Sequence, residues 1–205
     1  MCFGSSIKYT VIFKGGVLMS ENEKKKSKFK TIDLVYVGLF AALIAVCSWI
    51  SIPLTVPITL QTMGVCIAAG LLGTKRGTFS VLIYILLGLV GVPVFSGFKS
   101  GPGVLLGTTG GYIIGFLFTA IIVGVMTKML GNKLWVYVVS MILGIAVCYV
   151  FGTAWFIIIY NHNNADAVSL ATVLGWCVTP FIIPDLVKIA LASFLCLRLK
   201  KHIKD

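Results

Sequence analysis

Charged residues are scarce in this chain of 205 residues. Asp, Glu, Lys and Arg together make up 11% of the sequence, whereas an ordinary soluble domain has about 25%. Hydrophobic residues make up 59%, and apolar runs long enough to cross a bilayer recur along the chain. Such a composition excludes a set of water-soluble domains. It predicts one integral membrane bundle.

Acidic residues are especially few, with six Asp and Glu against 17 Lys and Arg, so the net charge is +11. A positive charge of this size can indicate nucleic-acid binding. Here the basic residues stand in short clusters between apolar segments rather than along one continuous face. Clusters of this kind are typical of the cytoplasmic loops of membrane proteins. The charge pattern therefore predicts a lipid bilayer, and no nucleic acid, as the partner.

The motifs of nucleotide, metal and covalent chemistry are also missing. No GxxxxGK[ST] loop is present, and GTKRGT at 73–78 lacks its order and spacing, so we expect no ATP hydrolysis by this chain alone. His162 and His202 stand alone, outside any metal-ligand motif. The six cysteines contain no CxxC pair and are interpreted as small hydrophobic residues. No nucleophile with a base and an orienting partner is recognisable. The sequence predicts no enzyme, cofactor or metal.

Six apolar segments predict the membrane crossings: 31–52, 61–74, 77–93, 108–130, 134–160 and 177–198. The second and third are short, which predicts tilt or a kink. Nearly all basic clusters fall on one side if six helices cross with both termini in the cytoplasm. The prediction is an all-α integral membrane protein, a six-transmembrane-helix bundle over 31–200, with cytoplasmic segments at 1–30 and 201–205.

The beginning of the sequence carries a second possible start. Residues 1–18 lack the long apolar core and small-residue cleavage site of a signal peptide. Met19 is followed at once by the charged run SENEKKKSKFK, which is typical of a solvated terminus. We expect the natural protein to begin at Met19.

Two basic residues break the charge pattern: Lys99, in the loop after the third segment, and Lys188, inside the sixth. Asp185 lies three residues before Lys188, so on a helix the two share a face and can pair. A charge near the bilayer centre costs about 2.5–3.5 kcal/mol on the insertion scale, and such charges usually face a cavity. A neutral ion pair inside the bundle is the alternative. The pattern favours a polar binding site open to the outside.

The first segment contains small residues at three- and four-residue spacing in GLFAALIA, 38–45. Small side chains let another helix approach closely. On spacing alone, packing inside the chain explains them as well as a partner does. These small residues are Gly38, Ala41, Ala42 and Ala45.

Four stretches carry a resemblance to a known family. VPITLQT at 56–62, GLVGVPVFSG at 88–97, GVLLGTTGGYIIGF at 103–116 and the Pro184-Asp185 pair with Lys188 resemble, in that order, motifs of the BioY family. This family is the biotin-binding membrane subunit of energy-coupling factor vitamin transporters. The resemblance covers about residues 33–200.

The chain departs from the family pattern at two places. The family commonly reads G-P-T-G-G-Y where this chain has GTTGGY at 107–112, so Thr108 replaces a rigid proline. It also commonly reads P-G-D before the last helix, whereas here Ile183 and Pro184 precede Asp185. The spacing from Asp185 to Lys188 is retained, so the second departure concerns the entry angle of the helix more than the charges.

The resemblance implies a six-helix bundle in the cell membrane, with a substrate site built from the outward loops and helix ends. It also implies partners: a transmembrane coupling subunit and two cytoplasmic ATPases, which would supply the nucleotide chemistry missing here. Ala41 and Ala45 match the AxxxA surface that such subunits present to the coupling subunit, and Gly38 and Ala42 lie on the same stretch.

The implied ligand suits the polar residues found independently. The ureido group of biotin has two N–H donors and a carbonyl acceptor, which a carboxylate and an ammonium satisfy together. Asp185 and Lys188 are expected in these roles. The valerate carboxylate needs a cation or several donors, and Lys99, Gln61 and the backbone amides of the Gly-rich loop are expected there.

Aromatic residues are expected to cover the apolar parts of biotin. The candidates are Phe95, Tyr112 and Trp176, although aromatic residues near the outer interface are common in all membrane proteins. A different class of function stays open at this point. The chain would then be a stand-alone membrane protein, such as an enzyme or a biotin facilitator or carrier without dedicated ATPases, that uses the Asp185–Lys188 pair itself.

Overall fold

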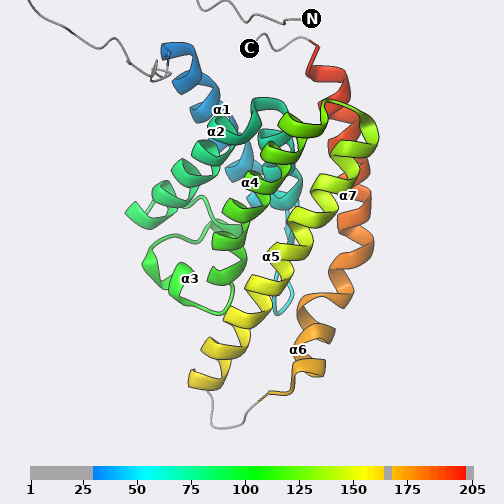
Figure 1. Cartoon of the computed structure of the whole chain (residues 1–205). Coiled ribbons are helices and arrows are strands. Elements are labelled where there is room, and N and C mark those ends of the chain that lie inside the picture. Colours follow the sequence, from blue (N-terminus) through cyan, green and yellow to red (C-terminus); the bar gives the residue numbers. More distant parts are fainter. Residues whose placement is uncertain (1–29, 164–167, 202–205) are drawn as a thin grey trace, which may run out of the picture.

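The computed structural model describes residues 30–163 and 168–201, which form a bundle of long helices (Figure 1). The predictions for residues 1–18, for Met19 and for the end of the tail lie outside the described residues. The all-α prediction is confirmed apart from one short hairpin. The long helices are α1 (Thr31–Trp49), α2 (Gln61–Val90), α4 (Gly110–Leu130), α5 (Leu134–Asn163) and α7 (Thr179–Leu199).

The start of α1 is tied to the middle of α2. The Asp33 carboxylate accepts a hydrogen bond from the backbone N–H of Lys30 at 2.9 Å, which satisfies a free donor in the first turn. The other oxygen of Asp33 lies 2.9 Å from the Arg76 guanidinium. Arg76 stands just after a break in α2. The beginning of α1 and the break in α2 therefore lie at the same end of the bundle.

Gly73 breaks α2 into two halves. Its backbone has φ 75° and ψ −175°, which is not helical and which glycine adopts readily. A Cβ placed on Gly77 would lie 2.7 Å from the Cα of Ala69, whereas eight residues of straight helix span about 12 Å. The chain therefore reverses at Gly73, and the two halves of α2 lie side by side.

The ends of α4 and α7 reach the same end of the bundle as this break. A Cβ on Gly124 in α4 would lie 2.4 Å from the Cα of Thr74. The Lys200 ammonium, just after α7, donates a hydrogen bond to the carbonyl of Leu71 at 2.9 Å. Figure 1 shows the start of α1 and the end of α7 together at the top.

Short elements lie toward the opposite end (Figure 1). The strands β1 (Ser51–Ile52) and β2 (Ile58–Thr59) pair antiparallel, with Ser51 opposite Thr59. The other short elements are the 3-10 turn η1 (Ser96–Phe98) and the helices α3 (Pro102–Leu106) and α6 (Leu170–Cys177). Ser169 caps α6 by accepting the backbone N–H of Thr172, a preferred cap for a helix start.

Within the described residues, five helical stretches are long and apolar enough to cross a membrane: α1, α2, α4, α5 and Leu170–Leu199. The predicted second and third segments both fall in α2, one on each side of Gly73. The predicted sixth segment, 177–198, is part of a longer helical stretch that begins at Leu170 in α6 and has an irregular point at Val178.

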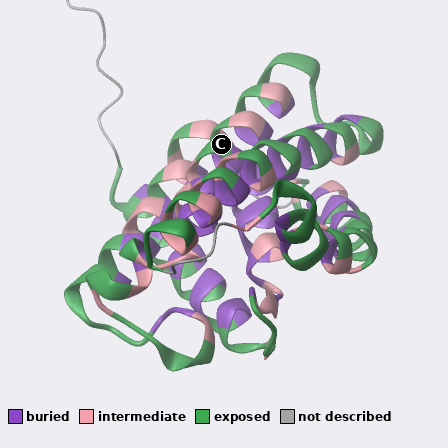
Figure 2. Cartoon of the chain, turned by 90° about the horizontal axis from the view of Figure 1, so that it is seen from below, coloured by how far each residue is buried: buried purple, intermediate pink, exposed green. Residues whose placement is uncertain are grey.

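Burial follows the inward faces of the helices. Figure 2 shows buried residues gathered inside the bundle and exposed residues around it. Many exposed residues are large and apolar, such as Leu39, Ile142 and Leu186. A soluble protein seldom exposes so much contiguous apolar surface, whereas lipid tails tolerate it. The outer surface is suited to a bilayer.

The small residues of α1 divide between the two sides of that helix. Ala41 and Ala45 are 1% and 6% exposed and belong to the core. Gly38 and Ala42 are exposed. The expectation that Ala41 and Ala45 face a partner is therefore corrected, because their side chains already pack inside this chain. The surface prediction stays a prediction for Gly38 and Ala42.

Candidate functional site

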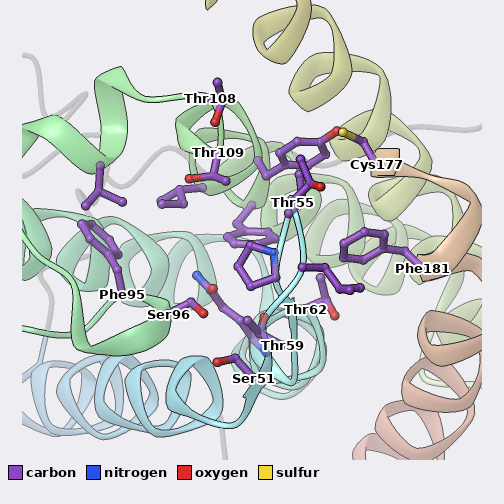
Figure 3. Close-up of a pocket in the computed structure, with 18 of the residues that line it drawn as sticks. Ser51, Thr55, Thr59, Thr62, Phe95, Ser96, Thr108, Thr109, Cys177 and Phe181 are labelled. Atoms are coloured by element: carbon purple, nitrogen blue, oxygen red, sulfur yellow. Dashed lines mark hydrogen bonds between the residues drawn. The ribbon is translucent and has the colours of Figure 1, made fainter. Parts of the chain in front are cut away.

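A cavity of about 610 Å³ lies where the β1–β2 hairpin, the loop of η1 and α3, and the helices α2, α4, α5 and α7 come together. Figure 3 shows polar side chains entering it from the hairpin, among them Ser51, Thr55 and Thr59. Cys177 and Phe181 close another side, from the junction of α6 and α7. The size is in the usual range for a small-molecule site.

Asp185 and Lys188 form the most polar part of the cavity wall. Their side chains are on α7, and the residues are 3% and 6% exposed. The Lys188 ammonium lies 2.7 Å from Oδ1 of Asp185, so the predicted pair is formed. Burying two charges is costly unless they are paired and hydrogen-bonded. This pair therefore needs the further partners that surround it.

Two other helices supply those partners. The hydroxyl of Thr62, on α2, donates to Oδ1 of Asp185 at 3.2 Å and accepts from Lys188 at 3.4 Å. The hydroxyl of Tyr149, on α5, donates to Oδ2 of Asp185. A carboxylate has about four acceptor sites, so these three donors leave one for a ligand. The network joins α2, α5 and α7 at the cavity.

Gln61 begins α2 and is buried in the cavity wall. Its side-chain amide donates to the hydroxyl of Tyr84 at 2.9 Å, and its backbone N–H donates to the hydroxyl of Thr59 in β2 at 3.2 Å. These bonds connect the hairpin to both halves of α2. They also fix the amide so that its carbonyl oxygen is available to another donor.

Phe95 is held by a close approach to α2. Its ring lies edge-on to Tyr84 with centroids 5.6 Å apart, and its N–H donates to the carbonyl of Lys99 at 3.1 Å. A Cβ on Gly88 would lie 2.1 Å from this ring, so only glycine leaves room for it. Lys99 lines the cavity and is exposed. Among the described residues it has no ion-pair partner.

The Gly-rich segment 107–112 brings Tyr112 to the cavity. A Cβ on Gly110 would overlap the carbonyl oxygen of Leu105 at 1.7 Å, so this turn between α3 and α4 requires glycine. The Tyr112 hydroxyl lies 3.1 Å from that of Thr153 on α5. Thr108, at the position of the family proline, points its hydroxyl side chain toward the same region (Figure 3).

Six of the seven residues predicted for the substrate site line this one cavity: Asp185, Lys188, Gln61, Phe95, Lys99 and Tyr112. Trp176 does not line it. Its ring packs near Tyr160, with centroids 6.2 Å apart, and the residue is 39% exposed. The next residue, Cys177, faces the cavity instead, because successive residues on a helix point in different directions.

Sequence reasoning missed two residues of the wall, Thr62 and Tyr149, and Tyr84, which lies behind the wall as the partner of Gln61. Thr62 lies inside the VPITLQT motif beside Gln61, so the motif could have predicted it. Tyr149 had a weaker signal, since a tyrosine within an apolar membrane segment needs a hydrogen-bond partner for its hydroxyl. Which partner it finds depends on how α5 and α7 pack.

Together the fold and the cavity define a helical membrane protein with a polar, ligand-sized cavity near one end of its bundle. The family model of the "BioY family" matches residues 21–205. This match covers most of the sequence. The chain belongs to the BioY family.

Individual relatives of this chain are members of the same family. The biotin transporter BioY of Thermotoga maritima is 41% identical over 170 residues, which are 82% of this chain and 96% of that protein. A probable biotin transporter BioY of Pyrococcus horikoshii is 41% identical over 174 residues, 84% of this chain and 98% of that protein. These relatives are named as transporters, not enzymes. With its apolar helices, the chain is a multi-pass plasma-membrane protein.

A solved structure has the same fold. It is the S-component for biotin from an ECF-type ABC transporter, and it matches with a TM-score of 0.75 and 32% sequence identity. The match covers 83% of this chain and 91% of that one. The family resemblance seen in the sequence motifs is confirmed.

Proposed function

We propose that this chain is the biotin-capturing S component of an energy-coupling factor transporter. The observation that carries the proposal is the buried Asp185–Lys188 pair, which opens on a cavity of about 610 Å³ in a chain of the BioY family. The relatives and the matching solved structure are named for biotin. The cavity explains how these residues would bind it.

The ureido group fits the Asp185 network. An N–H of the ureido group takes the remaining acceptor site of the Asp185 carboxylate, while the ureido carbonyl accepts from the Lys188 ammonium. Thr62 and Tyr149 hold the carboxylate in place before the ligand arrives. A site organised in advance loses less entropy on binding. These contacts make the α7 side the polar end of the site.

The valerate carboxylate and the apolar bicycle would use the loop side. Lys99 supplies a cation that has no ion-pair partner among the described residues, and the carbonyl and amide of Gln61 supply neutral polar groups. Phe95 and Tyr112 supply the apolar walls. Because Trp176 is not in the wall, it has no part in this proposal.

The reversal at Gly73 supports a six-crossing topology. In this topology each half of α2 crosses once and both termini lie in the cytoplasm. The basic residues near the break, near the end of α4 and after α7 then lie on the cytoplasmic side. The 610 Å³ cavity then opens to the outside.

Transport needs partners, because the chain has no nucleotide-binding motif. A transmembrane coupling subunit would contact the exposed small residues of α1, Gly38 and Ala42, and two cytoplasmic ATPases would supply the energy. Uptake by the isolated chain in liposomes tests the alternative of a stand-alone facilitator. The S-component proposal expects no sustained uptake without the coupling subunit and the ATPases.

Isothermal titration of the purified protein with biotin, in the absence of ATP, tests the substrate directly. We expect saturable binding with one ligand per chain. Dethiobiotin retains the ureido group and should compete. Binding of another vitamin, with no heat from biotin, would contradict the substrate assignment.

A further inference from the structure

A second cavity, of about 380 Å³, lies at the opposite end of the bundle from the first. It forms where the break at Gly73 meets the end of α4 and the residues after α7. Three lysines line it, each from a different part of the chain: Lys75, Lys128 and Lys200. None of its described lining residues is acidic.

No described carboxylate neutralises this cavity. The acidic residues in the described part of the chain are Asp33 and Asp185, and each is already in an ion pair, with Arg76 and Lys188 respectively. Within the described residues, Lys75 and Lys128 therefore leave this lining positively charged. Positive charge concentrated in a hollow attracts an anion more strongly than the same charge on a flat surface.

All three lysines fit the cytoplasmic charge pattern, and two of them also have a local stabilising interaction. Lys128 is in the last turn of α4, where a cation is favourable, and Lys200 donates to the carbonyl of Leu71. Lys75 is in the first turn of the second half of α2, just after the break. A cation at the start of a helix is unfavourable, whereas an anion there is stabilised.

The cavity also holds an unsatisfied hydroxyl. Oγ1 of Thr74 is buried and has no hydrogen-bond partner among the described residues. Buried polar atoms are nearly always hydrogen-bonded, so this hydroxyl is available to a partner other than the described residues. Lysine ammonium groups, a hydroxyl and first-turn N–H groups are together the donors that a phosphate group accepts from.

We propose that this cavity binds a phosphate group. Met129 and Leu130, beside Lys128, are exposed apolar residues, so the cavity borders the apolar surface of the bundle. A phosphate group at that place comes either from the headgroup of an anionic phospholipid or from free phosphate. The two sources share the chemistry and differ in whether an acyl chain is needed.

Native mass spectrometry of the purified, detergent-exchanged protein tests the proposal. The probes are dioleoyl-phosphatidylglycerol, dioleoyl-phosphatidylcholine and inorganic phosphate, each titrated separately. A lipid site predicts retention of phosphatidylglycerol over phosphatidylcholine, and a free-phosphate site predicts an adduct with inorganic phosphate alone. Either result supports the cavity. Absence of both a phosphatidylglycerol preference and a phosphate adduct would overturn the proposal.

Variants assign the binding to this cavity. Lys75→Gln and Lys128→Gln should each weaken it about tenfold, the usual size for one charge-assisted hydrogen bond. Lys133→Gln is the matched control, because Lys133 has the same charge, is close in sequence to Lys128 and does not line the cavity. Lys75→Arg keeps the charge and should retain binding. Equal loss in Lys133→Gln would show diffuse surface attraction and contradict the site.

Discussion

Asp185 receives side-chain hydrogen bonds from three helices, through Thr62, Tyr149 and Lys188. A buried carboxylate with this many donors is stabilised as an anion and held in one orientation. Lys188 donates to both Asp185 and Thr62, so these side chains form one network. Removing any member of the network changes the hydrogen bonds of the others. The residues that position the pair therefore matter for binding as well as the pair itself.

Tyr149→Phe removes the donor to Oδ2 of Asp185 and keeps the ring. We expect biotin affinity to fall about ten- to a hundredfold, since a hydrogen bond to a charged group contributes about 1.5–3 kcal/mol. Isothermal titration measures it. Tyr137→Phe is the control, because the Tyr137 hydroxyl bonds to Asn132, whose loop lies away from this cavity. Unchanged affinity in Tyr149→Phe would contradict a positioning role.

At the scale of elements, the loop after α2 depends on glycine. Gly88→Ala would place a Cβ 2.1 Å from the Phe95 ring, so the ring and the loop that carries Lys99 must move. Overpacking of this kind costs about 1–3 kcal/mol. We expect a lower melting temperature in detergent and weaker biotin binding.

The matched control for Gly88→Ala is Gly175→Ala in α6. Nothing lies within 4 Å of a Cβ at Gly175, and its backbone has no unusual φ. That variant should melt and bind as the parent does. Equal losses in both variants would show that the close contact at Phe95 is not the cause.

The two faces of α1 give opposite predictions. Ala42→Trp, on the exposed face, should block close approach of the coupling subunit and abolish ATP-driven uptake while biotin binding by the isolated chain persists. Ala41→Trp, in the core, should destabilise the chain itself. Uptake assays in proteoliposomes, with biotin titration in parallel, separate the two. Loss of binding by Ala42→Trp would contradict the partner-facing role of this residue.

For the whole molecule, apolar runs located the long helices, and the gap between the predicted segments 61–74 and 77–93 lies just after the break at Gly73. The sequence did not predict which face of α1 points away from the bundle. Ala41 and Ala42 differ by one position, and one position turns a helix by about 100°, so spacing alone did not say which faces outward. The loop motifs and the charges that break the basic pattern together predicted six cavity residues.

Contacts between distant helices were not predictable in the same way. The bond from Tyr149 to Asp185 joins residues 36 apart, and its partner is decided by how α5 packs on α7. Trp176 is the opposite case, a residue predicted for the cavity that does not line it. It was chosen from its place near the outer end, yet the end of α6 directs its ring toward Tyr160 and brings Cys177 to the cavity.

The measurement that tests the central claim most directly is a biotin titration of the double variant Asp185→Leu with Lys188→Met, beside the parent and the single variants Asp185→Asn and Lys188→Met. A monodisperse gel-filtration peak checks folding. If the pair binds the ureido group, each single variant should lose about 2–4 kcal/mol, or roughly 30- to 1000-fold in affinity, and the double variant at least as much. A folded double variant that binds biotin with near-parental affinity would contradict the claim, because the pair would then be only an internal ion pair that apolar residues can replace.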